Sequence, residues 1–108
     1  MNCQDKQGKL VRDRIPQLIR DGGAEPLVHT ADRDEYRVRL RDKLREEVAE
    51  FLAADDDAAP EELADVLEVV HALAADLGVD RDRLEQLRAA KAAERGGFCE
   101  RVVWRGNR

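Results

Sequence analysis

Two runs of carboxylates in the middle of the chain have the residue types and spacing of a metal site. The first is Glu46-Glu47-Val48-Ala49-Glu50 and the second is Glu62-Leu63-Ala64-Asp65. Acids spaced three or four residues apart lie on one face of an α-helix, one turn from each other. Hard cations such as Mg²⁺ prefer carboxylate oxygens, and acids this close repel one another without a cation. The spacing therefore predicts a magnesium site built from two helices.

Glu47 is the least ordinary of these acids. At about 100° per residue it lies on the edge of the apolar stripe of its helix, with Glu50 beside it. We expect that stripe to be buried and to consist of Leu40, Leu44, Val48 and Phe51. A carboxylate there is costly unless a positive charge compensates it.

The second acidic run borders an apolar stripe as well. Glu62 falls just outside this stripe, and Val69 lies between Glu62 and Asp65 on the helical wheel. The residues expected to be buried here are Val66, Val70, Leu73 and Leu77, flanked by Leu63 and Leu67. If the two helices pack antiparallel, their carboxylate edges meet.

A solvated acidic surface is the alternative interpretation. Charged residues make up 40% of the chain, so acids at helical spacing are expected by chance, above all Glu46 and Glu50. Glu62 also falls in the first turn of its helix, where the helix dipole favours acids. The position of Glu47 at the edge of the core favours the metal site.

The elements that must position these acids are four helices of an all-α, antiparallel bundle. We expect a short helix that begins near Pro16 and stops at Gly22-Gly23, and a long helix capped by Asp32 or Asp34 that runs to about Ala54. Pro60 starts the third helix, which ends near Leu77, and Asp80 caps the last, over 81–95. The connection of about five residues after Ala54 forces its neighbours antiparallel.

Other segments have smaller roles in the expected fold. Residues 26–30 and 101–104 are predicted to form a minor two-stranded β-ribbon. Leu10, Val11, Ile15, Leu18 and Ile19 are expected to be core contacts of the first helix. We divide the chain into a flexible N-terminus at 1–8, one domain at 9–104 and a tail at 105–108.

Size and charge exclude several classes of protein. A chain of 108 residues forms one domain with a modest core, for which oligomerisation adds apolar burial. The net charge of −5 argues against a nucleic-acid groove, and the chain has neither a membrane span nor a signal core. Cys3 and Cys99 lack metal or redox spacing, which favours a reduced, cytoplasmic protein, although a disulfide between them stays open.

The sequence allows two interpretations for several polar residues. Arg12 and Arg14 either bind phosphate or pair with acids, and Arg39 and Lys43 either pair along their helix or face phosphates. Tyr36 either stacks on a base or belongs to the core. The remaining assignments are a strand residue at His29, an exposed side chain at His71 and a solvated turn at Asp55-Asp56-Asp57.

The acidic pattern resembles the all-α nucleoside triphosphate pyrophosphohydrolases, which include MazG proteins and phosphoribosyl-ATP pyrophosphohydrolases. The opening Lys9-Leu10-Val11-Arg12-Asp13-Arg14-Ile15-Pro16 and the closing Lys91-x-x-x-Arg95-Gly96-Gly97-Phe98 are similar to a small single-domain branch of that superfamily. The resemblance extends over about 9–103. One departure is the gap of 11 residues between Glu50 and Glu62, which is short for the family and leaves no room for a base-contacting insertion.

The resemblance implies a Mg²⁺-dependent hydrolase, with Mn²⁺ as a substitute, that cleaves a nucleoside triphosphate or related nucleotide to the monophosphate and pyrophosphate. It implies Glu47, Glu50, Glu62 and Asp65 as metal ligands, and Glu46 as the residue that orients or deprotonates the attacking water. Phosphate contacts would come from Lys9, Arg12, Lys91 and Arg95. It also implies a homodimer or tetramer, with no nucleic-acid or membrane partner. The alternative is a non-catalytic helical module that binds a nucleotide, a metal or a protein.

Overall fold

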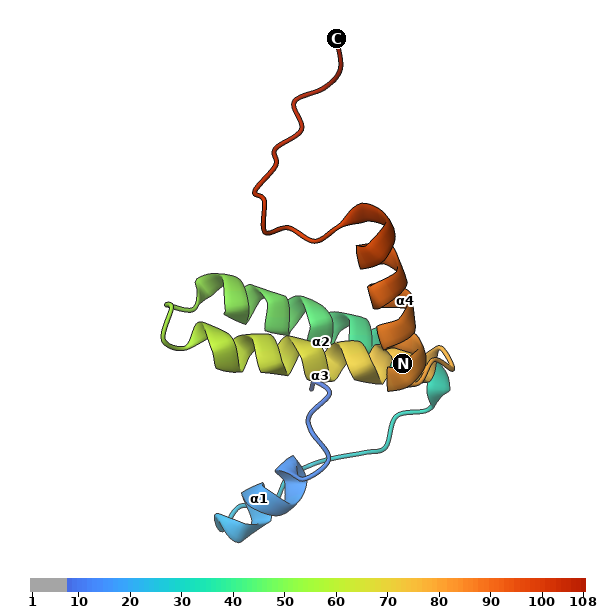
Figure 1. The fold of residues 1–108 in the computed structure, drawn as a ribbon. Helices are drawn as coiled ribbons and strands as arrows, with labels where there is room; N and C mark the ends of the chain where they lie inside the picture. Colours follow the sequence, from blue (N-terminus) through green and yellow to red (C-terminus); the bar gives the residue numbers. More distant parts are fainter. Residues whose placement is uncertain (1–7) are drawn as a thin grey trace.

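The computed structural model describes residues 8–108 and contains four α-helices in this range. Helix α1 spans Ile15–Asp21, α2 spans Arg33–Ala53, α3 spans Ala59–Asp76 and α4 spans Arg81–Arg95. Figure 1 shows α2 and α3 side by side as an antiparallel hairpin, with α4 turning away at its open end and α1 standing apart. The predicted all-α fold is confirmed.

Local signals account for the helix boundaries. The Asp32 side chain accepts a hydrogen bond of 2.9 Å from the Glu35 N–H, and Asp80 accepts one of 2.8 Å from the Arg83 N–H. Asp32, and not Asp34, is therefore the cap of α2. Pro16 and Pro60 occupy the first turns of α1 and α3, where the missing N–H costs no helical hydrogen bond.

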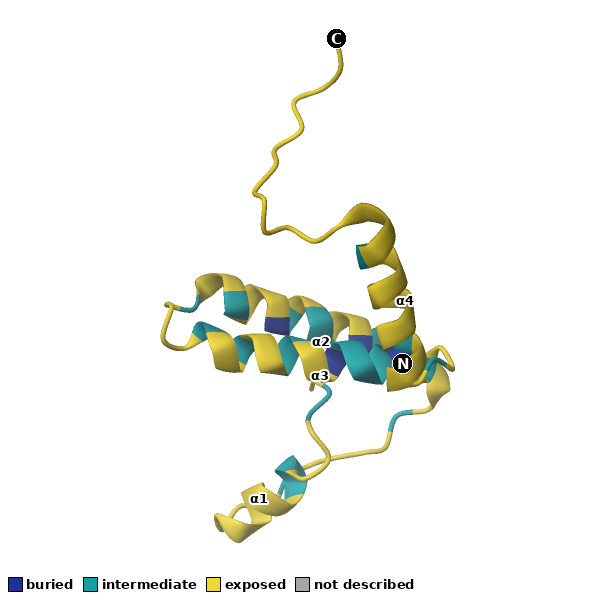
Figure 2. Cartoon of the chain, in the orientation of Figure 1, coloured by how far each residue is buried: buried dark blue, intermediate teal, exposed yellow. Residues whose placement is uncertain are grey.

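The core lies along the line where α2 meets α3, and Figure 2 shows buried positions on both helices there. Leu40 is 2% exposed, Val69 7% and Glu47 7%. A carboxylate is thus buried to the same extent as the apolar residues of the core, which are Leu40, Val69 and Ala74. This confirms that Glu47 lies on the packed face of its helix.

The predicted apolar stripes are only partly correct. Val48 is 38% exposed, and Leu63 and Leu67 on α3 are 51% and 53% exposed. Leu77 is also exposed. Val69, which was predicted to lie outside the apolar stripe, is buried. The reason is that α3 turns its carboxylate edge toward α2, so the leucine edge faces away from the hairpin.

The short helix α1 does not pack as expected. Leu18 is 60% exposed and Ile19 39%, although both were predicted as core contacts. Leu10, Val11 and Ile15 are half-buried. Figure 1 shows why: residues 8–14 and 22–32 hold α1 away from the α2–α3 hairpin.

The predicted β-ribbon is wrong for this chain, because the structure contains no strand within residues 8–108. The segment around 26–30 runs between α1 and α2, while α4 directs residues 98–108 away from the opposite side of the hairpin (Figure 1). The two segments are therefore too far apart to pair. Leu27 is 98% exposed and Trp104 77% as a result.

The helices that the structure describes include none that is long and apolar enough to cross a membrane. Cys99 is exposed, and Cys3, its possible disulfide partner, lies outside the described residues together with most of the predicted flexible N-terminus.

Candidate metal and phosphate site

Glu47 is the centre of the site because it belongs to two groups of carboxylates. Oxygens of Glu46, Glu47 and Glu50 lie within 4.8 Å of one another, and so do oxygens of Glu47, Glu62 and Asp65. The first group comes from successive turns of α2, and the second joins α2 to α3. The antiparallel hairpin thus brings together all five acids that the sequence predicted.

Two carboxylate oxygens at this point have no hydrogen-bond donor. Oε2 of Glu47 and Oε2 of Glu62 are both buried without a partner among residues 8–108. Buried acceptors are normally satisfied, and a buried charge without a counterion is expensive. Oxygen ligands from two facing helices fit a hard divalent cation such as Mg²⁺ or Mn²⁺. The residues present therefore fit a metal ion.

The crowding of these acids affects Glu50. The pKa of Glu50 is raised above its usual value, first by the close approach of the Glu47 carboxylate and then by the charges of Glu62 and Glu46. A shared proton relieves the repulsion between neighbouring carboxylates, as a bound cation does.

Three basic side chains compensate part of the negative charge. Lys43 Nζ lies 3.0 Å from Glu47 Oε1 and 3.4 Å from Glu46 Oε2, and it is only 16% exposed. Lys9 Nζ lies 3.1 Å from Glu46 Oε1. Arg12 Nη2 lies 2.7 Å from Asp65 Oδ1. Residues 8–14 therefore lie against the hairpin through ion pairs that reach across 37 and 53 residues of sequence.

These pairs also shift the pKa values of Glu46 and Lys43. Burial tends to raise the pKa of Glu46, but the hydrogen bonds and charges of Lys9 and Lys43 outweigh it, so the pKa is lowered. Burial likewise opposes the charge on Lys43, yet its contacts with Glu47 and Glu46 raise its pKa. Both groups stay ionised at neutral pH.

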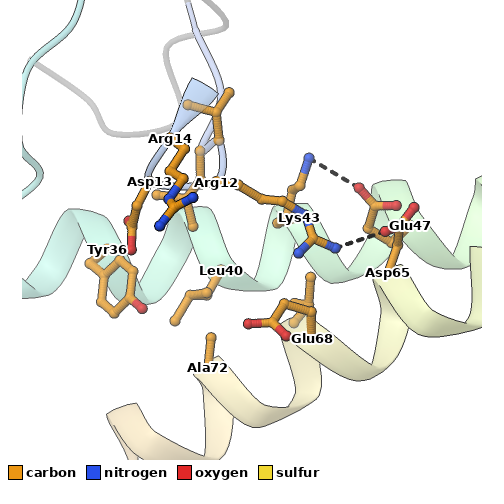
Figure 3. A pocket seen from close by; sticks show the side chains of 13 residues that line it. Arg12, Asp13, Arg14, Tyr36, Leu40, Lys43, Glu47, Asp65, Glu68 and Ala72 are labelled. Carbon is orange, nitrogen blue, oxygen red and sulfur yellow. Dashed lines mark hydrogen bonds and ion pairs between the residues drawn. The ribbon is translucent and has the colours of Figure 1, made fainter. Parts of the chain in front are cut away.

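A cleft of about 440 Å³ opens beside these carboxylates. We call it the carboxylate cleft. Figure 3 shows Lys43 with Glu47 and Arg12 with Asp65 at one end of the cleft, and Tyr36 at the other end. Acids that can hold a cation and bases that can bind an anion thus face the same cavity.

For Lys43 the sequence left two interpretations open, a helical ion pair or a contact with phosphate. The i,i+4 spacing from Lys43 to Glu47 was the available signal, but it predicts a helical ion pair equally well. Arg39 shows that ambiguity, because it pairs with Glu35 on its own helix at 3.1 Å. Only the position of residues 8–14 opposite Lys43 marks it as part of a cleft.

The other predicted phosphate ligands are not brought to the carboxylates within one chain. Lys91 and Arg95 are exposed on the last turns of α4 and do not line the carboxylate cleft. Asp76, which the sequence placed too far away to share a metal ion with Glu62, pairs with Arg37 at 3.0 Å.

The two histidines differ from their predicted surroundings. His29 lies in an irregular segment, and its Nε2 contacts the Glu35 carboxylate at 2.9 Å. His71 was predicted to be exposed, but it is half-buried on α3 and its Nδ1 is buried without a partner. The acidic turn at 55–57 is exposed as expected.

Comparison with known proteins gives a family match for this chain. The family model described as phosphoribosyl-ATP pyrophosphohydrolase matches residues 17–91, which is more than half of the chain. The chain belongs to the phosphoribosyl-ATP pyrophosphohydrolase family. The matched range contains all five clustered acids and Lys43, whereas Lys9 and Arg12 precede it. Members of this family of pyrophosphohydrolases typically depend on a metal ion, and the acid clusters could bind one.

A relative in Mycolicibacterium smegmatis (strain ATCC 700084 / mc(2)155), named only as an uncharacterized protein, is 57% identical over 54 residues. This match covers 49% of the present chain and 55% of the relative, so the two share about half of their lengths. No solved structure matches the chain.

Proposed function

We propose that this family member is a Mg²⁺-dependent nucleotide pyrophosphohydrolase that converts a nucleoside triphosphate, or a related nucleotide, to the monophosphate and pyrophosphate. The observation that carries the proposal is the buried Glu47 carboxylate, which two acid clusters share and whose Oε2 has no donor among the described residues. Family membership supports the type of reaction, and the cleft supports a substrate with several phosphates.

The metal ligands in this proposal are Glu47, Glu50, Glu62 and Asp65. A divalent ion bound there supplies positive charge to the phosphate oxygens and lowers the pKa of water. Mn²⁺ is expected to replace Mg²⁺, because both accept oxygen ligands.

The remaining side chains bind and orient. Glu46 is held ionised by Lys9 and Lys43, so it can accept a hydrogen bond from the attacking water. Its lowered pKa favours this orienting role over proton abstraction, for which a pKa near the working pH is best. Arg12 lies on the wall of the cleft and Lys9 is held nearby by its pair with Glu46, so both can contact phosphate oxygens.

We also propose that the protein works as a homo-oligomer. Val48 and Leu52 lie one turn apart on α2, and Leu63 and Leu67 one turn apart on α3, with exposed fractions from 38% to 74%. The Cα radius of gyration is 17.9 Å, against about 13 Å for a compact chain of this length. A second copy would cover apolar surface that this chain leaves open.

The test is incubation of the purified protein with a panel of nucleoside triphosphates, with and without Mg²⁺, followed by identification of the products. We expect a monophosphate and pyrophosphate from at least one nucleotide, and no product in the presence of a chelator. Nucleotide binding without any product would contradict the enzymatic proposal and support a non-catalytic binding module.

A further inference from the structure

A second cavity adjoins the carboxylate cleft. It has a volume of about 500 Å³ and lies between residues 8–13 and the irregular segment 27–31. Leu10, Val11, Arg12, Asp13 and Tyr36 line both cavities, so a single wall separates them. We call the second cavity the His29 pocket. The two cavities are therefore adjacent, with Arg12 at their shared wall.

The His29 pocket combines an apolar surface with fixed polar groups. Leu27, which is 98% exposed, and Val28 supply apolar surface on one strip of its lining. Glu35 Oε2 lies 2.9 Å from His29 Nε2 and accepts a hydrogen bond of 3.1 Å from Arg39 Nε. Arg39 also donates to the Gly8 carbonyl at 2.8 Å. Glu35 and Arg39 are 19% and 12% exposed, so this network is held in place.

The network also determines what His29 offers to a ligand. The hydrogen bond from His29, followed by that from Arg39, lowers the pKa of Glu35, so the carboxylate is ionised and can only accept. Nε2 of His29 is then the donor in this contact, and the Nδ1 edge of the ring is left free to contact a ligand. The His29 side chain is 67% exposed, so a ligand in the pocket can reach it.

These features suit a flat, partly apolar group with polar atoms on its edge, which describes a nucleobase. Ligand pockets of this size are typically apolar with a few placed polar groups. The carboxylate cleft next to it suits a metal-bound polyphosphate. We propose that the His29 pocket binds the nucleoside part of the substrate, with His29 contacting the base and Tyr36 lying between base and phosphates. This inference rests on the proposed function, because it assigns the second half of the same substrate.

The test separates nucleoside contacts from phosphate contacts by calorimetry. AMP, GMP, CMP and UMP are titrated into the protein in the presence of a chelator, and pyrophosphate is titrated in the presence of Mg²⁺. We expect at least one monophosphate to bind, and His29→Ala to weaken its binding at least tenfold while pyrophosphate binding stays within twofold. The matched control is His71→Ala, which removes the other histidine and lines neither cavity.

A second variant guards against misfolding of the first. Leu27→Asp places a charge on the pocket lining at a side chain that is almost fully exposed. We expect this variant to bind the same monophosphate more weakly. Equal monophosphate affinity in wild type, His29→Ala and Leu27→Asp would overturn the proposal, and so would the failure of every monophosphate to bind. Product formation is measured separately: absence of hydrolysis contradicts the proposed function alone, while the binding results decide the pocket.

Discussion

The Glu47 side chain concentrates the chemistry of this protein in one residue. It is buried, as Leu40 and Val69 are, and it belongs to both acid clusters. One of its oxygens contacts Lys43 and the other has no donor among residues 8–108. A leucine at this position would pack at least as well as a glutamate. The charge of Glu47 is therefore the property that explains its presence.

Replacing that charge should separate function from folding. We expect Glu47→Gln to lower turnover by on the order of 10²-fold or more, because it removes the ligand that both clusters share. Product release from the nucleotide panel measures this, and circular dichroism checks the fold. Glu68→Gln is the matched control, since Glu68 lines the same cleft outside both clusters. Full turnover in Glu47→Gln would refute the assignment.

Glu35 should make stability depend on pH in a defined direction. Its pKa is lowered from 4.5 in the folded protein, chiefly by His29. A carboxyl group with a lowered folded pKa stabilises the fold above its unfolded value, and this contribution disappears as the pH falls through the folded value. We therefore expect the melting temperature of wild type to exceed that of Glu35→Gln at pH 7, and the difference to shrink below about pH 4.

Thermal melts of both proteins between these pH values measure the effect. Glu94→Gln serves as the control, because Glu94 is an exposed acid of α4 without an ion pair in the part of the chain described by the structure. A difference between wild type and Glu35→Gln that stays constant across the range would contradict the role given to Glu35.

At the scale of elements, the α2–α3 hairpin and the segment 8–14 make the site together. The hairpin supplies the acids, and the segment supplies Lys9 and Arg12. The connection of a few residues after α2 requires antiparallel helices, which places the acids near the end of α2 opposite those near the start of α3. No comparable local rule places the segment 8–14, whose ion pairs span long stretches of sequence.

Because Arg12 forms an ion pair with the Asp65 carboxylate, it should compete with a metal ion for that carboxylate. We expect Arg12→Gln to bind Mn²⁺ more tightly in the absence of nucleotide, by up to about fivefold, since an exposed ion pair is worth up to about 1 kcal/mol. The same variant should bind pyrophosphate with Mg²⁺ more weakly, because a phosphate contact is lost.

Calorimetric titration measures both affinities. Arg14→Gln is the matched control, since Arg14 lines the carboxylate cleft without an ion pair to either acid cluster. An Arg12→Gln variant with weaker Mn²⁺ binding would show that Arg12 supports the metal site instead of competing with it.

At the scale of the whole molecule, the leucine edge of α3 is an apolar surface that a single chain does not cover. Leu63 and Leu67 are more than half exposed although they lie on the helix that forms the core. Aliphatic side chains at this spacing are typical of a helix face that packs against another helix. The radius of gyration is also larger than a single compact chain requires.

A charge on that edge should disrupt the proposed oligomer. We expect wild type to run as a dimer or tetramer and Leu67→Glu to shift toward the monomer at micromolar concentration, because a buried unpaired carboxylate is costly. Light scattering coupled to size-exclusion chromatography gives the mass of each. Leu18→Glu on α1 introduces the same change at a similarly exposed leucine away from the hairpin. A monomeric wild type would rule the proposal out.

Local rules were sufficient for much of this architecture. Asp80 and Pro60 mark the starts of two helices. These starts can be predicted from sequence because capping and the φ angle of proline depend only on neighbouring residues. The helical period likewise placed Glu47 at the edge of a buried face, and it placed the acids of each run together. These predictions concern contacts within one helix or across one short connection.

Tertiary packing decided the rest. The helical period shows that α3 has an apolar face and an acidic face, but not which one meets α2; the fold buries Val69 and leaves Leu67 exposed. It also brings Arg12 to Asp65 and keeps residues 26–30 apart from 101–104. Such choices depend on the relative free energies of alternative contacts between residues far apart in sequence. The spacing of nearby residues does not determine these free energies.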